Sequence, residues 1–154
     1  MERNHIVIRR LILALVTFGI VVTSIDLMLL DHHEDVRQMA PLVANSLAIA
    51  TILWHVASGS AASVQALRVV MAVFLAAAVL GVVFHFQGNL EFQLEINPAQ
   101  STWELFSKVM RAKAPPALAP GVMAQLGLLG LIYTYRHPAL SSSSNSDRTR
   151  GDTA

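Results

Sequence analysis

The 154-residue chain contains no cysteine and few charged side chains. The absence of cysteine excludes disulfides, thiol nucleophiles and thiolate metal sites. Charged residues make up 14% of the sequence, whereas a soluble domain carries roughly a quarter. Hydrophobic residues make up 54%. This balance indicates a protein that lies in a lipid bilayer rather than a soluble domain.

An excess of one charge sign is also lacking, since the formal net charge is +1. A charge so close to zero gives no long-range attraction for nucleic acid, and no basic stripe with interleaved aromatic residues appears. Catalytic signatures are lacking too. No H-E-x-x-H or H-x-x-x-H spacing is present. His55 has Thr51 four residues before it and Ser58 three residues after it, but helices often produce this spacing by chance, so it does not indicate a nucleophile beside a base. We expect no catalytic residue, no cofactor and no nucleic-acid partner.

Four long apolar runs set the fold class. A helix crosses the roughly 30 Å hydrocarbon layer with about 20 mostly apolar residues, because it rises 1.5 Å per residue. The sequence therefore predicts an all-α membrane protein with four transmembrane helices in a bundle. The second run is the weakest, since Asn45, Thr51 and His55 dilute it, but Pro41 before it suits the first turn of a helix. The predicted spans are residues 11–30, 42–58, 69–86 and 117–135.

Residues 1–140 form the predicted membrane domain, and the polar tail 141–154 is expected to be disordered because it has nothing apolar to bury. With the N-terminus inside, seven of the eleven Lys and Arg residues fall on the inner side. This bias predicts that both termini are cytoplasmic. Alternatively, residues 1–24 are a cleaved signal peptide. The apolar run continues to Leu30, which is long for such a segment and favours a retained helix.

Two polar clusters follow the predicted outer ends of the first and third spans. Imidazole and carboxylate groups together suit Zn, Mn, Fe or Ni, and a carboxylate such as Asp26 costs about 2.5–3.5 kcal/mol at mid-helix. One hypothesis is therefore an outer-face site for a divalent metal or small ligand. The other, favoured by the missing metal-binding spacing, is that these residues are hydrated where the chain leaves the membrane. The candidate metal ligands are Asp26, His33, His85, Glu91 and Glu95, with His32 and Asn89 as further polar residues of this face.

The predicted outer loop, residues 87–116, contains the segment "LEFQLEI", residues 90–96. Apolar and polar residues alternate there with the period of a strand. Glu91 and Glu95 share one face in either a helix or a strand. Because an isolated strand is unstable, we expect an extended or helical segment that lies along the membrane surface.

The same loop continues with "STWELFSKVMRAK", residues 101–113. Ser101 and Glu104 form a capping-box pattern, which predicts the start of a helix. Its apolar face is typical of a short amphipathic helix in the membrane interface, and a docking surface for a partner subunit is the alternative. That face comprises Trp103, Phe106 and Met110, with Leu105 and Val109 beside it.

Small and amide side chains recur in the apolar runs, and we expect them where helices touch. Lipid gives helices no hydrophobic drive to associate, so close packing and polar bonds hold them together. Gln125 is expected to be a buried amide. The other positions are Asn45, Ser46 and Thr51 in the second span, Ala77 and Gly81 in the third, and Gly121, Ala124, Gly127 and Gly130 in the fourth.

Two histidines that hold one haem must lie at one depth. His55 is near the inner end of its span and His85 near the outer end of another, so they do not share an iron. The pairs that remain are His85 with His32 or His33 on the outer side, and His55 with His137 or His5 on the inner side. We do not expect a haem site.

One resemblance adds to this interpretation. The blocks "GVVFHFQGNLEF", residues 81–92, and "APPALAPGVMAQLGLLGLIYTYRHP", residues 114–138, resemble a family of small uncharacterised bacterial integral membrane proteins with four predicted spans. The likeness covers roughly the second half of the chain. It implies a four-span protein of the bacterial inner membrane and brings no established activity.

The leading functional hypothesis is a non-enzymatic accessory or structural membrane protein. Its expected partners are the lipid bilayer and a protein on the outer loop, and a homo-oligomer is compatible with the sequence. The second hypothesis is the metal or small-ligand site, which predicts bound metal that is lost in His85→Ala. The third is a small oligomeric transporter, which predicts loss of flux in Asp26→Asn. An accessory protein is insensitive to both changes.

Overall fold

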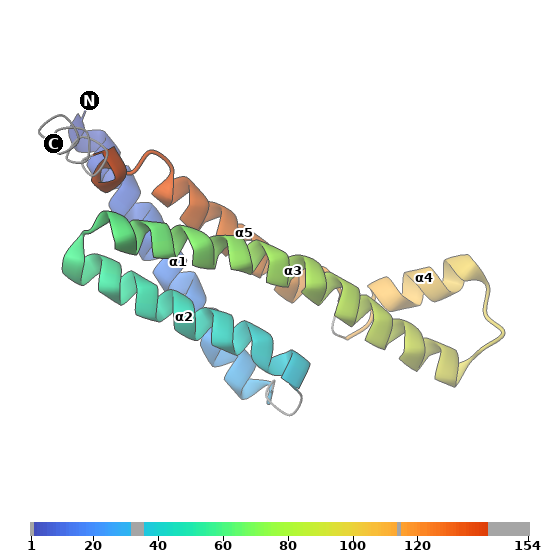
Figure 1. Cartoon of the computed structure of the whole chain (residues 1–154). Helices are drawn as coiled ribbons and strands as arrows, with labels where there is room; N and C mark the ends of the chain where they lie inside the picture. The colour runs from blue at the N-terminus through green and yellow to red at the C-terminus, as the bar shows by residue number, and fades with distance from the viewer. Residues whose placement is uncertain (1, 32–35, 114, 142–154) are drawn as a thin grey trace, which may run out of the picture. The chain divides into compact units, whose positions relative to one another are not determined.

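The computed structural model describes residues 2–31, 36–113 and 115–141 (Figure 1). Within these residues all regular structure is helical, so the predicted all-α fold is confirmed. The predicted tail falls on 142–154, which lie outside the described residues. The helices are α1 (Glu2–Leu29), α2 (Val36–Ser58), α3 (Ala61–Ile96), α4 (Thr102–Met110) and α5 (Leu118–Thr134).

Three of the described helices are long and apolar enough to cross a membrane. The qualifying segments are Asn4–Leu29, Gln38–Ser58 and Ala61–Ile96, and α5 is a shorter apolar helix of 17 residues. At most 28% of the residues in each apolar window are buried within the protein. A soluble monomer rarely exposes apolar surface on this scale. The three long helices therefore suggest a membrane-embedded protein.

The helices begin and end beyond several of the predicted spans. α2 begins at Val36, so Pro41 lies inside the helix and not in its first turn. α3 begins at Ala61 and continues through "LEFQLEI" to Ile96, so of the extended and helical alternatives for that segment the helix is present. A helix satisfies its own backbone hydrogen bonds, whereas a strand needs a partner strand. Apolar runs mark only the part of a helix that suits lipid, and the helix continues where side chains are polar.

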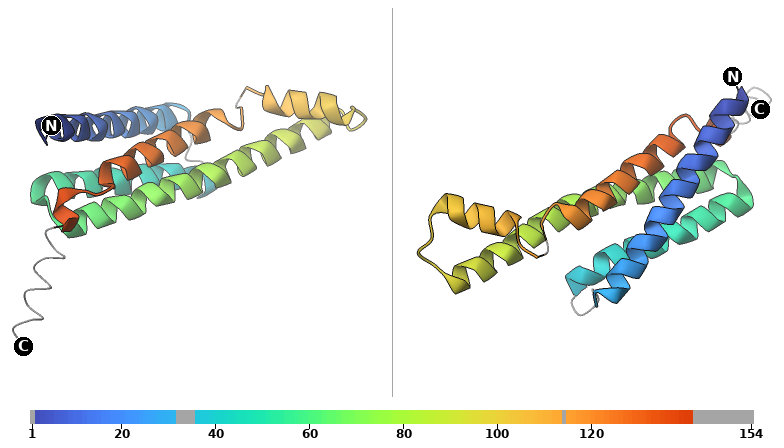
Figure 2. Two further views of the ribbon diagram at one scale, coloured as in Figure 1. Left: turned by 90° about the horizontal axis from the view of Figure 1, so that it is seen from above. Right: turned by 180° about the vertical axis from the view of Figure 1, so that it is seen from behind.

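The chain divides into two compact units, which are described separately. Unit 1 is Met1–Val73 with Leu126–Ala154, and unit 2 is Phe74–Gln125. In unit 1, α1 and α2 lie side by side and antiparallel, and a two-residue turn joins α2 to α3 (Figures 1 and 2). Gly59 adopts a φ of 57° in that turn, which glycine tolerates without strain. Ser60 then accepts a hydrogen bond from the Ser63 amide (3.2 Å) and so starts α3.

The core of unit 1 follows helical periodicity. Its buried side chains recur at intervals of three or four residues, which places them on one face of each helix. Asn45, 2% exposed, donates hydrogen bonds to Ser24 Oγ (3.0 Å) and Thr23 Oγ1 (3.3 Å) and so ties α2 to α1. The prediction that Asn45 contributes to helix contacts is therefore confirmed. Within unit 1, the buried apolar residues of α1 to α3 are Val16, Ile20, Ala44, Ala48, Ile52, Val64, Leu67 and Met71.

Other expected contact positions behave differently. The hydroxyls of Ser46 and Thr51 donate to carbonyls of their own helix, at 2.9 Å in each case, and not to a neighbour. Gln125 is exposed and not a buried amide. A Cβ at Gly121 would meet nothing within 4 Å, whereas a Cβ at Gly130 would overlap the side chain of Met71. Of these two glycines, only Gly130 lies where α3 and α5 approach closely.

Gly130→Ala should lower the free energy of unfolding by about 1–3 kcal/mol, because the new methyl group displaces the buried Met71 side chain. Gly121→Ala on the same helix is the matched control and should raise it by up to about 1 kcal/mol, because alanine favours a helix and the new methyl group meets nothing. Unfolding in mild detergent would measure both. In a Met71→Ala background the cost of Gly130→Ala should shrink, and an undiminished cost would contradict this packing.

Unit 2 contains the remainder of α3, α4 and the start of α5. The predicted amphipathic helix is present as α4, and Ser101 is its N-cap, accepting from the Glu104 amide at 3.3 Å. The carboxylate of Glu104 forms an ion pair with Lys108 (2.8 Å) one turn later. Asn89 Nδ2 donates to the carbonyl of Val109 (3.3 Å), so this amide ties α3 to the last turn of α4.

Candidate functional site

A buried polar network lies at the end of unit 1 where α2 ends, α3 begins and α5 ends. His55 Nδ1 is 3.0 Å from Ser63 Oγ, and His55 Nε2 is 2.6 Å from Tyr133 Oη. The tight turn after α2 brings Ser63 to His55, because only eight residues separate them. Tyr133 comes from the last turn of α5. The exposed fractions of the three residues are 6% or less, so these bonds are shielded from water.

The hydrogen-bond donors in this network can be assigned from its geometry. Ser63 Oγ donates to the carbonyl of Ser60 (2.8 Å), so the hydroxyl proton is committed there. Ser63 Oγ therefore accepts from His55 Nδ1–H, which leaves Nε2 as the acceptor for the Tyr133 hydroxyl. In this neutral tautomer both ring nitrogens are bonded to protein groups. Every polar atom of the imidazole is satisfied.

Two arginines bind the C-terminal end of α5. The guanidinium of Arg9 donates to the carbonyls of Tyr133 (2.6 Å), Tyr135 (3.0 Å) and Arg136 (3.2 Å). Arg68, from α3, donates to the carbonyl of Thr134 (2.7 Å). The last carbonyls of a helix have no partner within the helix and carry partial negative charge, so cations stabilise them. Together with His55, these side chains tie α1, α2, α3 and α5 at one end of unit 1.

His137 lies against the same network. Its ring centroid is 5.2 Å from that of His55 and 5.3 Å from that of Tyr133. His137 Nδ1 accepts from the Ala139 amide (3.3 Å). Burial lowers the pKa of His137 below its usual range, and the nearby His55 ring and Arg9 guanidinium lower it further. His137 is therefore held neutral beside cationic and imidazole neighbours.

The lowered pKa of His137 predicts a loss of stability in acid. The unfolded chain, with an ordinary pKa of about 6.5, takes up the proton first as the pH falls. The contribution of His137 is thus complete above that pH and is lost between it and the lower folded-state pKa. The melting temperature in detergent should therefore fall less between pH 7.5 and 5.5 in His137→Gln than in the wild type. His5→Gln, at an exposed position, should show the wild-type fall, and equal falls in all three proteins would contradict the prediction.

The arrangement suits helix-to-helix contacts better than acyl-transfer chemistry. Ser63 is completely buried, and its hydroxyl proton points to a backbone carbonyl and not to His55. A serine nucleophile needs a neighbouring base that takes its proton and a site for the reacting carbonyl. Neither geometry is present at Ser63. We take the network as the candidate site because it contains His55, which is buried, together with its hydrogen-bond partners Ser63 and Tyr133. These side chains bond one helix to another.

The predicted metal ligands are distributed over both units. Asp26 is exposed in α1 of unit 1, whereas the others that are described lie on α3 of unit 2, where His85 is half-buried and Glu91 and Glu95 are exposed. His32 and His33 lie outside the described residues. The part of the chain that is described contains no group of three or more His, Cys, Asp or Glu that could hold a metal ion. Because the hypothesis includes His33, it stays a prediction.

The sequence named His137 and His5 as the histidines able to approach His55 and did not predict that either does so, and the structure places the His137 ring beside His55. Sequence reasoning missed the bonds from His55 to Ser63 and Tyr133. The segment "HVASGSAAS", residues 55–63, could have indicated the contact with Ser63, because its glycine and serines favour a tight turn directly after His55. Comparison of the chain with protein-family models, curated proteins and solved structures gives no match.

Proposed function

We propose that the protein is a non-enzymatic accessory protein of the bacterial inner membrane, with four spans, both termini in the cytoplasm and an outer loop that contacts a partner protein. One observation carries the proposal. The buried polar side chains at the end of unit 1 are used in bonds between helices, with both nitrogens of His55 and the guanidinium of Arg9 engaged. Polar residues bonded in this way hold a scaffold together.

The length of α5 supports a fourth span. Its 17 residues make about 25 Å of helix, at the short end of the range for a membrane crossing. No charged residue occurs between Leu118 and Thr134. A short span is accommodated by local thinning of the bilayer at modest cost. By contrast, the 36 residues of α3 make about 54 Å of helix, so its polar end at residues 85–96 extends beyond the hydrocarbon.

The distribution of charge supports the orientation. In unit 1, Asp26 lies near the C-terminal end of α1 and Asp31 lies just after that helix, at the far end from Arg9 and Arg10. Glu2 is the one acidic residue of α1 at the same end as these arginines. Cationic ends of membrane proteins face the cytoplasm. We refer to the end of unit 1 that carries Arg9, Arg10, Arg68 and Arg136 as the basic end.

The surface of α4 supports a contact on the outer side. Trp103 is 76% exposed and stacks on Phe106 with ring centroids 5.8 Å apart, while Val109 on the neighbouring side is buried. An exposed aromatic pair suits the headgroup region of a bilayer. With that face in the interface, the charged side that includes Arg111 faces water. A partner would contact this side.

A photo-crosslinking residue at Arg111 tests the proposal in cells, with the same residue at Trp103 as the matched position. We expect a protein adduct of discrete mass from position 111 and lipid adducts from position 103. Asp26→Asn and His85→Ala should leave the adduct unchanged, because neither a transporter carboxylate nor a metal ligand is required. Absence of a protein adduct at 111, or its loss in either variant, would count against the accessory role.

A further inference from the structure

A groove lies between α1 and α2 near the basic end, and its lining is one cation, one hydroxyl and otherwise apolar side chains. The hydroxyl is that of Thr17, which donates to the Leu13 carbonyl of its own helix (2.8 Å). Arg10, Ala14 and Phe18 contribute from α1, and Leu53 and Val56 contribute from α2. The three α1 residues recur every four positions and form one stripe along the helix. The small side chain of Ala14 leaves the space between its larger neighbours. The stripe spans about 12 Å of helix, with the guanidinium at one end.

Arg10 differs from its neighbour Arg9 in what it binds. Arg9 donates to the carbonyls at the end of α5, whereas Arg10 is exposed and has no hydrogen-bond or ion-pair partner among the described residues. Along α1, Glu2 lies about 12 Å of helix before Arg10, and Asp26 lies about 24 Å of helix after it. Among the described residues, the guanidinium of Arg10 is therefore an unpaired cation, and it lines a mostly apolar groove.

We propose that this groove binds one anionic phospholipid, with the phosphate on Arg10 and an acyl chain along Ala14 and Phe18. A guanidinium matches the oxygens of a phosphate in two parallel hydrogen bonds. Basic pockets between membrane helices bind anionic headgroups in this manner. The inference rests on the proposed placement in the membrane. It goes beyond that placement because it assigns a ligand class to one groove.

The headgroup, and not the acyl chain, provides the selectivity. An acyl chain leaves hydrocarbon to enter an apolar groove, so it gains no hydrophobic free energy. The phosphate of an anionic lipid meets a cation that has no partner in the described part of the chain. Preference for an anionic over a zwitterionic lipid therefore depends on Arg10, while the apolar lining determines only whether a chain fits.

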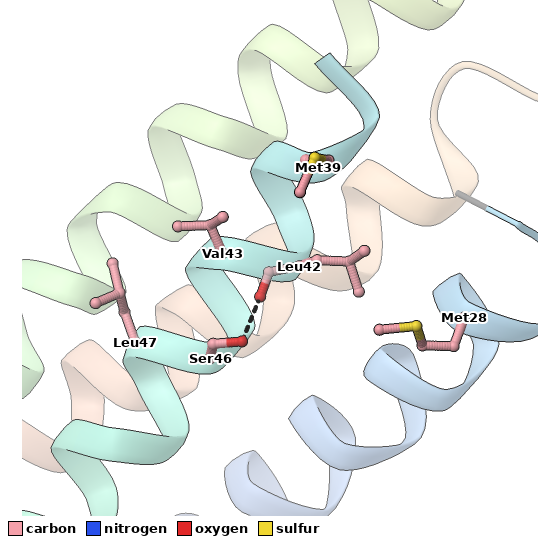
Figure 3. Close-up of a pocket in the computed structure, with 6 residues that line it drawn as sticks. All are labelled: Met28, Met39, Leu42, Val43, Ser46 and Leu47. Carbon is pink, nitrogen blue, oxygen red and sulfur yellow. Dashed lines mark hydrogen bonds between the residues drawn. The ribbon is translucent and has the colours of Figure 1, made fainter. Parts of the chain in front are cut away.

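The same pair of helices provides an internal comparison. A second groove between α1 and α2 lies towards the other end of these helices and is lined by Met28, Met39, Leu42, Val43, Ser46 and Leu47 (Figure 3). None of these side chains is charged, and the Ser46 hydroxyl donates to the Leu42 carbonyl (2.9 Å). This groove accepts an acyl chain without selecting a headgroup.

Quenching of tryptophan fluorescence by brominated lipids tests the proposal on the full-length protein in vesicles. In a Trp54→Phe, Trp103→Phe background, a single tryptophan placed by Leu53→Trp reports on the Arg10 groove, and one placed by Leu47→Trp reports on the second groove. Brominated phosphatidylglycerol is compared with brominated phosphatidylcholine. We expect a severalfold preference for phosphatidylglycerol at position 53 and none at position 47.

Variants of Arg10 separate charge from packing. Arg10→Gln should reduce the preference at position 53 about fivefold, because a cation near anionic headgroups contributes about 1 kcal/mol. Arg10→Lys should retain the preference, and Ala14→Phe should reduce quenching by both lipids by filling the groove. Arg111→Gln, which removes the same charge elsewhere, should have no effect. Soluble glycerol phosphate at millimolar concentration should not compete, since it lacks the acyl chain.

The outcomes distinguish this inference from the proposed placement. Quenching at both positions without a preference for phosphatidylglycerol would overturn the lipid site and leave the membrane placement intact. The same conclusion follows if Arg10→Gln and Arg111→Gln reduce the preference equally, or if glycerol phosphate competes. If neither the tryptophan at position 53 nor the one at position 47 is quenched, both the lipid site and the membrane placement are overturned.

Discussion

Tyr133→Phe should lower the free energy of unfolding by about 1–3 kcal/mol, although it removes only one oxygen atom. The hydroxyl donates to His55 Nε2 at 2.6 Å, and the His55 side chain is 6% exposed. Without this donor, a buried nitrogen acceptor has no partner and pays its full desolvation cost. Tyr135→Phe is the matched control, because Tyr135 is 62% exposed, and it should change stability by less than about 0.5 kcal/mol.

A double-mutant cycle with His55→Leu tests the bond directly. His55→Leu leaves the Tyr133 hydroxyl without its acceptor, so this variant should also be less stable. In the double variant both polar groups are gone, and its loss of stability should be smaller than the sum of the two by about 0.5–3 kcal/mol. Reversible unfolding in mild detergent provides the four free energies. Strict additivity, or equal effects of Tyr133→Phe and Tyr135→Phe, would contradict the assigned network.

Arg9→Gln should lower the free energy of unfolding in neutral detergent by about 2–3 kcal/mol, whereas Arg10→Gln at the neighbouring position should lower it by less than about 0.5 kcal/mol. The guanidinium of Arg9 donates to three carbonyls at the end of α5, and that of Arg10 donates to no described group. In Arg9→Gln, water can bind the exposed carbonyls of Tyr135 and Arg136 in place of the guanidinium. Most of the lost stability therefore arises at the partly buried Tyr133 carbonyl.

Hydrogen exchange locates the effect of the Arg9 substitution. In Arg9→Gln the amides of Tyr135 and His137, which donate to carbonyls in the last turn of α5, should exchange faster than in the wild type. In Arg10→Gln they should exchange at the wild-type rate. The two variants remove the same charge one residue apart, so general electrostatics affects both equally. Equal losses of stability and equal exchange in the two would show that Arg9 does not hold this end of α5.

The sequence predicted the helices better than their ends. The apolar run at residues 117–135 predicted α5 to within one residue at each end, and the capping-box pattern of Ser101 and Glu104 predicted the N-cap of α4. The start of α2 at Val36 and the end of α3 at Ile96 were not predicted, because hydropathy reports where side chains suit lipid. A helix ends where its backbone finds other partners, and in α3 that point lies ten residues beyond the predicted span at Phe86.

The network was harder to predict, for a geometric reason. His55 and Tyr133 are 78 residues apart, and each reaches the other only if its helix is rotated correctly about its own axis. Hydropathy does not determine that rotation in α5, whose described residues are apolar on every side. Nor does the pair "RR" indicate that Arg9 binds α5 while Arg10 lines a groove. These assignments require the packed helices.

Thiol labelling at single introduced cysteines tests the four-span topology most directly, because the chain has no cysteine of its own. His5→Cys, Ala99→Cys and Ser141→Cys place one thiol near the start of α1, one between α3 and α4, and one after α5. In intact cells, a membrane-impermeant maleimide should label Ala99→Cys alone, and the other two should react only after the membrane is opened. Labelling of both Ala99→Cys and Ser141→Cys in intact cells would show that α5 does not cross the membrane and would contradict the four-span account.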